Sequence, residues 1–423
     1  MFKCIPVFYI LLLTGFSISS AHGQHCATMK NLERHIARSP ELMNYIERYK
    51  LLSRQRLAAD ITSPSEGQIL TIPVVVHVIW HRTLENVSDA QIQSQIDALN
   101  RDYRLRNADS LRKTHPFWPS ITDTKIEFCL AKRDPNGNPT SGITRTMTDT
   151  VAFYGIGSEK RTALGGMDNW NPDKYLNLWV CNLDGGGEGI LGYASFPFER
   201  LSAPEDDGVV IDYRSFGTMG TAQSPNALGR TATHEIGHWM DLYHIWGDLE
   251  PDCGDDDVLD TPPGDEPNYD CPSFPQDPNS VCGTDENGEM YMNYMDYVVD
   301  GCMVMFTKGQ AARMQTSLKN DRPGLFTSLG CSTPSDVDEG LLSDRAPIYP
   351  QPSSGVFTVN FSNPTPGRTT ITLLNLLGEP VYALEGVIGT TTQINVPHFG
   401  SGVYYLMIQS AYSTITERVI ITQ

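Results

Sequence analysis

Three histidines and one glutamate lie within a segment of eleven residues, and their spacing restricts how this segment can fold. His234 and His238 are four residues apart, so on an α-helix both side chains project from the same face. Glu235 lies between them on that helix. His244 is six residues beyond His238, which is too far to join them if the helix continues straight. We therefore predict a helix that ends near Asp241, a residue type that tolerates positive φ, and a turn there that brings the three imidazoles together.

These side chains match the ligand set of a catalytic zinc ion. Three neutral imidazoles leave the ion its full double charge and one open coordination position, so a water bound there becomes acidic near neutral pH. Glu235 can reach that water and act as general base. The alternative is a helix with ordinary surface or core histidines, and the third histidine argues against it. We predict zinc ligation by His234, His238 and His244.

A short segment downstream, Asn293–Tyr297, makes a resemblance to a known family specific. Together with the histidines it resembles the metzincin zinc endopeptidases, in particular the pappalysin group with its ulilysin-like and cytophagalysin-like bacterial members. The resemblance implies that Met295 belongs to the Met-turn, the apolar floor beneath the metal, and that the Tyr297 phenol stabilises the oxyanion. Core packing is the alternative role for both side chains. The chain departs from the family motif at Asp241, where the motif has a glycine.

The N-terminus predicts export. Lys3 is followed by an apolar run at residues 5–16 and by the small residues Ala21-His22-Gly23, which together are typical of a signal peptide over residues 1–23 with cleavage before Gln24. The apolar run is too short for a transmembrane anchor. We expect a secreted, extracellular protein that meets the cell surface during export.

Length and charge limit the kinds of partner. A chain of 423 residues predicts two or three domains. Its net charge of -19 argues against nucleic acid or an anionic membrane as a partner, because both require a basic surface. No other stretch approaches membrane-spanning length, so we expect the mature protein to be released. With the predicted zinc site, the expected partners are protein or peptide substrates.

Residues 24–66 form a charged, helix-periodic segment that resembles a propeptide. Cys26 is its most informative residue, because a thiolate delivered to zinc would replace the nucleophilic water and keep the enzyme latent. The pappalysin-like bacterial enzymes carry an early Cys-Gly-Thr, whereas this chain has Cys26-Ala27-Thr28. The alternative is a structural cysteine that pairs elsewhere. We predict a zymogen with Cys26 as its latency switch.

Residues 67–331 are expected to form the catalytic domain. An apolar β-branched run at 72–80 predicts a central strand, and Ser88 caps a helix that follows. Further strands are predicted at 125–131, 176–181 and 208–213, with an edge strand at 189–197 that could hold an extended substrate. The predicted fold class is α+β: a metzincin-like domain with a mixed twisted sheet, a zinc helix and a loop-rich lower subdomain, followed by a small all-β sandwich.

Acidic and turn residues crowd the segment after the zinc helix, from residue 248 to residue 285. So many like charges need a counter-ion, and calcium prefers oxygen ligands. Related enzymes also bind calcium in this region. The spacing is not that of an EF-hand, and a solvated acidic loop is the alternative. The candidate calcium ligands are Asp256, Asp257, Asp260 and Thr261.

Eight cysteines remain after removal of the signal peptide, in an export context that favours disulfides. The resemblance implies the pairs Cys253–Cys282 and Cys271–Cys302, although four cysteines allow three pairings. Three further cysteines have no clear partner: Cys129, Cys181 and Cys331. A bridge from Cys129 to Cys181 between neighbouring strands is one option.

A polar linker at residues 332–347 precedes the last domain, residues 348–423. Short alternating strands there predict a small antiparallel sandwich. With Asn375-Leu376-Leu377-Gly378 and Gly402-Val403-Tyr404, it resembles the C-terminal sorting domain of type IX secretion substrates, which implies the secretion machinery as a partner. A generic carbohydrate- or matrix-binding sandwich is the alternative.

The combined prediction is a secreted zinc endopeptidase made as a zymogen. Its alternative is a catalytically inert binding or adhesion protein on a protease fold, against which the presence of Glu235 and Tyr297 argues. A peptidase that trims chain ends is a second alternative. The segment 298–306 should line the pocket for the residue after the scissile bond. The position of Asp300 suggests a turn. Met303 and Met305 suggest an apolar pocket, and we therefore predict cleavage before apolar residues rather than before arginine.

Overall fold

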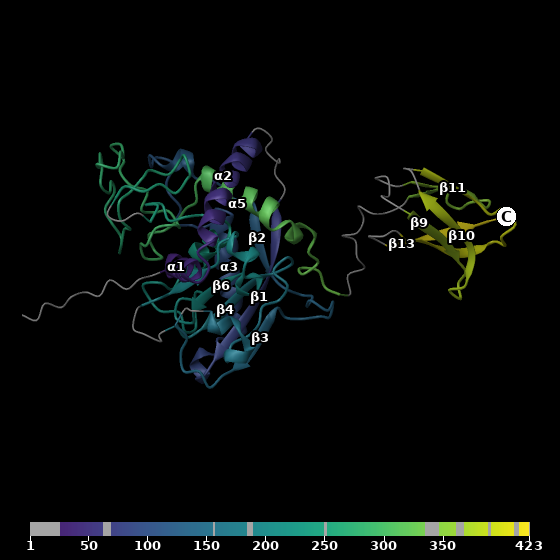
Figure 1. Cartoon of the computed structure of the whole chain (residues 1–423), viewed down its shortest axis with the longest axis horizontal. Helices are drawn as coiled ribbons and strands as arrows, with labels where there is room; N and C mark the ends of the chain where they lie inside the picture. The colour runs from purple at the N-terminus through teal and green to yellow at the C-terminus, as the bar shows by residue number, and fades with distance from the viewer. Residues whose placement is uncertain are drawn as a thin grey trace, which may run out of the picture. The chain divides into compact units, whose positions relative to one another are not determined.

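The computed structural model describes residues 26–61, 69–154, 157–183, 189–248, 252–334, 347–360, 368–387, 391–409 and 414–422. The chain divides into two compact units, Met1–Pro334 and Ser335–Gln423 (Figure 1). The predicted signal peptide and most of the predicted linker lie outside the described residues. Within the described ranges, no helix combines the length and the apolar character that crossing a membrane requires.

A mixed sheet forms the centre of the first unit, in the order β2-β1-β4-β6-β5, with β3 also paired to β1. All its pairings are parallel except that of β5 with β6. The strands are β1 (Leu70–Trp80), β2 (Ile126–Leu130), β3 (Ile143–Met147), β4 (Leu176–Cys181), β5 (Gly192–Ala194) and β6 (Val209–Asp212). The predicted edge strand is confirmed but short: it is β5, at one end of this order.

Two helices pack on the sheet and build the main core. Ser88 caps α3 (Asp89–Tyr103) by accepting a hydrogen bond from the Gln91 amide, as predicted. The helix α4 (Arg230–Trp239) carries the histidine motif. Alternate side chains of β1 enter a core shared with both helices, and each buried aliphatic side chain contributes about 1.5–3 kcal/mol. The core members from these elements include Val74, Val76, Val78, Ile92, Ile96, Leu99, Ala232 and Ile236.

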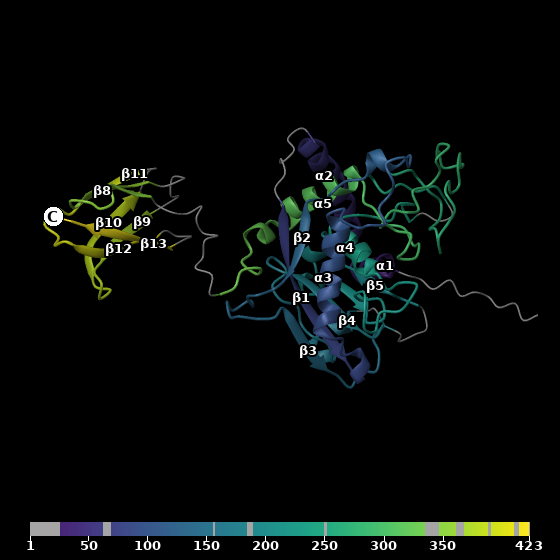
Figure 2. The same cartoon turned by 180° about the vertical axis from the view of Figure 1, so that it is seen from behind.

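The N-terminal helices lie against the sheet and helices of the first unit. Both views show α2 (Leu42–Ile61) beside α5 (Lys308–Asp321) (Figures 1 and 2). The helix α1 (Thr28–Arg38) lies near β5 (Figure 2). Leu42, Ile46 and Tyr49 of α2 are buried against Phe196, Phe198 and Tyr243. Short 3-10 helices lie in the connections: η1 (Thr83–Glu85), η2 (Trp118–Ser120), η3 (Ser158–Lys160), η4 (Thr162–Leu164), η5 (Glu199–Leu201), η6 (Pro204–Asp206) and η7 (Pro323–Thr327).

The segment between α4 and α5 has no helix or strand among its described residues, and disulfides crosslink it. One bond joins Cys253 to Cys282 and another joins Cys271 to Cys302. Crosslinks of this kind reduce the entropy of the unfolded chain where a loop-rich segment buries little apolar surface.

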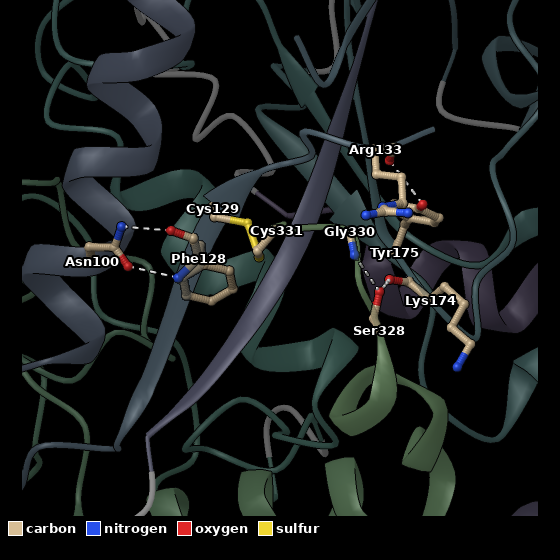
Figure 3. The surroundings of a disulfide bond; sticks show 9 residues. All are labelled: Asn100, Phe128, Cys129, Arg133, Lys174, Tyr175, Ser328, Gly330 and Cys331. Atoms are coloured by element: carbon tan, nitrogen blue, oxygen red, sulfur yellow. Dashed lines mark hydrogen bonds between the residues drawn. A yellow bond between two sulfur atoms is a disulfide. The ribbon is translucent and has the colours of Figure 1, made fainter. Parts of the chain in front are cut away.

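The suggested bridge from Cys129 to Cys181 is wrong. Cys129 of β2 pairs with Cys331, far along the chain, and Cys181 is a buried free thiol (Figure 3). The reason is the strand order: β1 separates β2 from β4, so the two cysteines are not on neighbouring strands. The segment after α5 reaches Cys129 instead, and Ser328 secures it by donating a hydrogen bond to the Lys174 carbonyl at 2.7 Å (Figure 3).

The second unit is an all-β domain of two antiparallel sheets, as predicted. One sheet has the order β10-β9-β12-β13 and the other β11-β8-β7. Alternate side chains such as Phe357, Ile371 and Leu406 fill the core. The strands are β7 (Ile348–Tyr349), β8 (Val356–Asn360), β9 (Arg368–Leu374), β10 (Pro380–Val387), β11 (Thr391–Asn395), β12 (Gly402–Gln409) and β13 (Thr414–Ile421).

Candidate metal centre

The three histidines of the motif converge on one point. His234 and His238 project from α4, and the chain turns after Trp239 so that His244 meets them. Their Nε2 atoms lie 3.0–3.3 Å from one another. Zinc–nitrogen bonds of about 2.0–2.1 Å in a tetrahedral site place ligand nitrogens roughly 3.3 Å apart. The three nitrogens are therefore spaced as zinc ligands.

Each imidazole is oriented by a hydrogen bond from its other nitrogen. His234 Nδ1 lies 2.7 Å from the Tyr294 carbonyl oxygen, and His238 Nδ1 lies 2.7 Å from the Leu242 carbonyl oxygen. His244 Nδ1 lies 2.6 Å from Asp248 Oδ1. These acceptors favour a proton on Nδ1, which makes Nε2 the nitrogen of each ring that can bind a metal.

Sequence reasoning did not identify two residues that fix His244. Asp248 accepts the hydrogen bond just described, and its spacing of four residues from His244 was the available signal. The indole of Trp246 stacks on the imidazole with ring centroids 4.4 Å apart and an angle of 5° between the planes. These contacts restrict the ring of His244 in both position and tilt.

Met295 lies directly beneath the zinc helix. It is fully buried, and its amide donates a hydrogen bond to Asn293 Oδ1 at 2.9 Å. A Cβ atom on Gly237 would lie only 2.5 Å from Met295 Sδ, so a larger residue at this point of α4 would displace the methionine. This close contact between Met295 and α4 supports the predicted role of Met295 as the apolar floor beneath the three histidines.

Glu235 faces two groups of the N-terminal segment. Its Oε2 accepts hydrogen bonds from Thr28 Oγ1 at 2.9 Å and from Cys26 Sγ at 3.4 Å, and its Oε1 has no partner among the described residues. Complete burial raises the pKa of Glu235 to about 8. Sequence reasoning did not assign Thr28 a role, although it belongs to the Cys-Ala-Thr segment.

Cys26 joins the histidine cluster itself. Its Sγ and one nitrogen of each histidine all lie within 4.8 Å of one another. The adjacent backbone follows the edge of the sheet, because the Ala27 amide donates to the Gly192 carbonyl at 3.0 Å. Burial and then the Glu235 charge raise the pKa of the Cys26 thiol. A bound divalent cation would act in the opposite direction and favour the thiolate.

Tyr297 is buried beside the histidines, with its ring centroid 4.8 Å from that of His244. Its hydroxyl donates a hydrogen bond to the Cys26 backbone carbonyl at 3.4 Å. The phenol thus points at the backbone carbonyl of the residue whose Sγ joins the histidine cluster. A phenol in this orientation can donate to a carbonyl oxygen, as an oxyanion donor does.

An open cavity adjoins these groups, with about 290 Å³ of space between atoms that includes open solvent. Asp300 lies in a turn, as predicted, but it is also buried and lines this cavity together with Met303, whereas Met305 does not. The Leu228 and Arg230 amides donate hydrogen bonds to Asp300 Oδ2 at 2.7 and 3.3 Å. These bonds to distant segments draw the carboxylate inward.

Two of the four candidate calcium ligands contact each other, and the other two have separate partners. Asp256 Oδ1 and Thr261 Oγ1 lie 2.6 Å apart, and Asp256 Oδ2 is buried without a partner among the described residues. Asp257 pairs with Arg54, and Asp260 accepts bonds at the N-terminus of α5. A different acidic group gathers elsewhere in the lower subdomain, with ligand atoms within 4.8 Å: Asp265, Asp277 and Glu289.

Comparison with known proteins identifies both units of the chain. Residues 164–319 match the peptidase family described as pregnancy-associated plasma protein-A, and residues 347–422 match the secretion system C-terminal sorting domain. An extracellular metalloprotease of Arthroderma benhamiae is 30% identical, over 66% of this chain and 87% of the relative. One from Coccidioides posadasii is 30% identical, over 73% of this chain and 97% of the relative.

Solved structures with similar folds include two forms of mirolysin from Tannerella forsythia. A variant of promirolysin is 43% identical with a TM-score of 0.63, and the match covers 71% of this chain and 97% of that one. Mature mirolysin in complex with a cleaved peptide is 48% identical with a TM-score of 0.58, over 61% of this chain and 96% of that one. The metzincin-like fold and the extracellular location predicted above are confirmed. The chain therefore belongs to the pappalysin family of extracellular metalloproteases, as a metalloendopeptidase that ends in a secretion sorting domain.

Proposed function

We propose that the chain is made as a zymogen and that its mature form hydrolyses internal peptide bonds in extracellular proteins with zinc bound by His234, His238 and His244. The observation that carries this proposal is the set of three Nε2 atoms, 3.0–3.3 Å apart, with the Glu235 carboxylate beside them. Bound zinc would supply a Lewis acid and an acidic ligand water.

Each remaining step falls to a side chain of this protein. Glu235 would take the proton of the attacking water and return it to the leaving amine, since it is next to the cluster and has no cationic partner among the residues described. Tyr297 would donate its hydroxyl to the substrate carbonyl oxygen. The edge of β5 would hold the substrate backbone, as it holds Ala27 here.

The proposal is tested by incubating the mature enzyme with an unstructured protein. We expect internal cleavage that stops when a chelator removes the metal and returns when zinc is added. Cleavage that persists in the metal-free protein would contradict the mechanism. Release of single terminal residues alone would favour the chain-trimming alternative.

We expect Tyr297→Phe to fold and to keep zinc but to hydrolyse peptides about 100-fold more slowly, because one oxyanion donor contributes roughly 3 kcal/mol. Tyr294→Phe is a matched control, because Tyr294 is also a buried tyrosine of this segment. Steady-state kinetics separates the two effects: the loss should be in kcat. An unchanged rate would assign Tyr297 to core packing.

The position of Asp300 changes the predicted specificity. Among the described residues, Asp296 and Asp300 line the cavity and no lysine or arginine lines it, so we expect the pocket to accept a basic residue after the scissile bond rather than an apolar one. Asp300→Asn keeps the hydrogen-bond acceptor and removes the charge. We expect it to lower kcat/KM for arginine substrates by about 30-fold or more, as buried charge pairs contribute 2–5 kcal/mol.

Sequencing of fragments from a digested proteome measures this preference, and Met303→Leu serves as a control that leaves the carboxylate in place. A wild-type enzyme that cuts mainly before leucine or phenylalanine would restore the apolar prediction.

We also propose that calcium binds at Asp256 and Thr261. Burial raises the pKa of Asp256 to about 8, and an unpartnered buried carboxylate oxygen favours a cation. Calcium should then raise the unfolding temperature by several degrees, and Asp256→Asn should remove that effect. Asp277→Asn is the matched control. If only this variant loses the calcium-induced rise in unfolding temperature, calcium binds instead at the group of Asp265, Asp277 and Glu289.

The domain limits follow from the same proposal. Residues 24–66 would be the propeptide, residues 67–331 the protease domain, and residues 348–423 the domain that the secretion machinery recognises. The C-terminal unit has its own sandwich core, and its sorting role is supported by the match over residues 347–422.

A further inference from the structure

The turn between the second and third histidines contains a charged residue in a conformation that favours glycine. The Leu242 amide donates to the Gly237 carbonyl at 3.0 Å, which closes a Schellman motif at the end of α4. Asp241 occupies the position at which such motifs usually have glycine, with φ of 75°. Its side chain is fully buried.

A buried carboxylate in this turn needs a partner, and α5 supplies one. Arg313 Nε donates a hydrogen bond to the Asp241 carbonyl oxygen at 2.6 Å and lies 3.2 Å from Asp241 Oδ2. Ser53 of α2 also donates to Asp241 Oδ2, at 2.8 Å. Oδ1 of the same carboxylate has no partner among the described residues. Arg313 therefore supplies the positive charge that compensates the Asp241 carboxylate. The hydrogen bond from Ser53 would be lost when the proposed propeptide is removed.

Arg313 also reaches the residue that precedes the third histidine. Its guanidinium lies over the ring of Tyr243, 4.7 Å from the centroid. The contacts with Asp241 and Tyr243 lie on either side of Leu242, whose carbonyl orients His238. One buried side chain thus contacts the turn on both sides of Leu242, between His238 and His244.

We propose that Arg313 is a positioning residue for His244: by pairing with the Asp241 carboxylate it stabilises the turn that a glycine would adopt without help. This inference rests on the zinc site proposed above. Without Arg313, the buried carboxylate would lose its counter-charge, and the turn would open to hydrate it. The third imidazole would then leave the other two.

A purely structural role for Arg313 predicts something different. Its NH1 group lies 3.5 Å from the Asp256 carbonyl oxygen and 3.4 Å from that of Asp257, so it also connects α5 to the lower subdomain. In that role, its loss would destabilise the fold whatever residue occupies position 241. The two roles are distinguished by removing the carboxylate and the guanidinium separately and together.

The experiment compares four full-length proteins: wild type, Arg313→Met, Asp241→Gly and the double variant. Zinc content is measured across a chelator series, and unfolding temperature is measured in the zinc-free state. We expect Arg313→Met to lose half its zinc at a chelator concentration about 10- to 100-fold lower than wild type, the usual effect of losing an outer-shell partner. Asp241→Gly should stay near wild type, and the double variant should match it, because no carboxylate is left unpaired.

Several results would overturn the proposal. Wild-type zinc affinity in Arg313→Met would overturn it. So would a double variant that loses zinc as severely as Arg313→Met. If Arg313→Met does not fold, a double variant that folds and binds zinc supports the proposal, and one that does not fold contradicts it. A wild-type protein that binds no zinc contradicts the proposed function as well, which distinguishes that failure from the failure of this inference alone.

Discussion

Replacing Glu235 by alanine is expected to remove peptide hydrolysis while zinc stays bound. The three histidines are oriented by Tyr294, Leu242 and Asp248 rather than by Glu235, so the ligand set does not depend on the carboxylate. Glu235 would instead move protons, a contribution of about 10²- to 10⁴-fold to the rate. The measurement is kcat on a peptide substrate together with zinc content per protein.

Glu235→Gln provides the matched control for this result. The amide has the size of the carboxylate and keeps a hydrogen-bond acceptor for Thr28 and Cys26, but it cannot take a proton. Both variants should therefore lose hydrolysis alike. Turnover near the wild-type rate in either of them would refute the assignment of Glu235 as general base. Loss of zinc in both would show that the carboxylate supports the ligands.

The parts of the fold that the sequence predicts well depend on local patterns. The long strand β1 is an uninterrupted apolar run, and α3 and α5 begin at residues that cap them, Ser88 and Thr307. The histidine spacing belongs to the same kind of signal, since a helix period places His234 and His238 on one face. Asp241 could be identified as the turn because the histidines on both sides of it, His238 and His244, were predicted to bind the same ion.

The parts that the sequence does not predict depend on segments far apart in the chain. The strand β3 was not predicted, because its side chains are half-buried or exposed and its apolar pattern is weak. Cys129 and Cys331 are 202 residues apart, and only the strand order shows why they meet. The position of Asp300 also depends on a distant segment. The amides of Leu228 and Arg230 bind its carboxylate beside the cavity, and the sequence around position 300 does not predict these hydrogen bonds.

The precursor is expected to become active when Cys26 is replaced by alanine. Cys26 Sγ lies within 4.8 Å of the histidine nitrogens, where it would occupy the position of the nucleophilic water. Its thiol also contacts Glu235, and its carbonyl accepts the Tyr297 hydroxyl, so one residue engages each group to which we assign a catalytic role. The assay is hydrolysis of a short fluorogenic peptide by the intact precursor, with mass spectrometry to confirm that it has not been cut.

The matched control for this variant is Cys181→Ala, because Cys181 is the other free and buried cysteine of the described chain and lies outside the histidine cluster. That variant should stay as silent as the wild-type precursor. Thr28→Val tests the second contact, since it removes the 2.9 Å bond to Glu235 but leaves the thiol. We expect activity to rise far more in Cys26→Ala than in Thr28→Val, because only the thiol competes for the metal. If Cys26→Ala stays silent, latency instead comes from the Ala27 backbone in the cleft and from the docking of α2, whose buried side chains would then be the inhibitor.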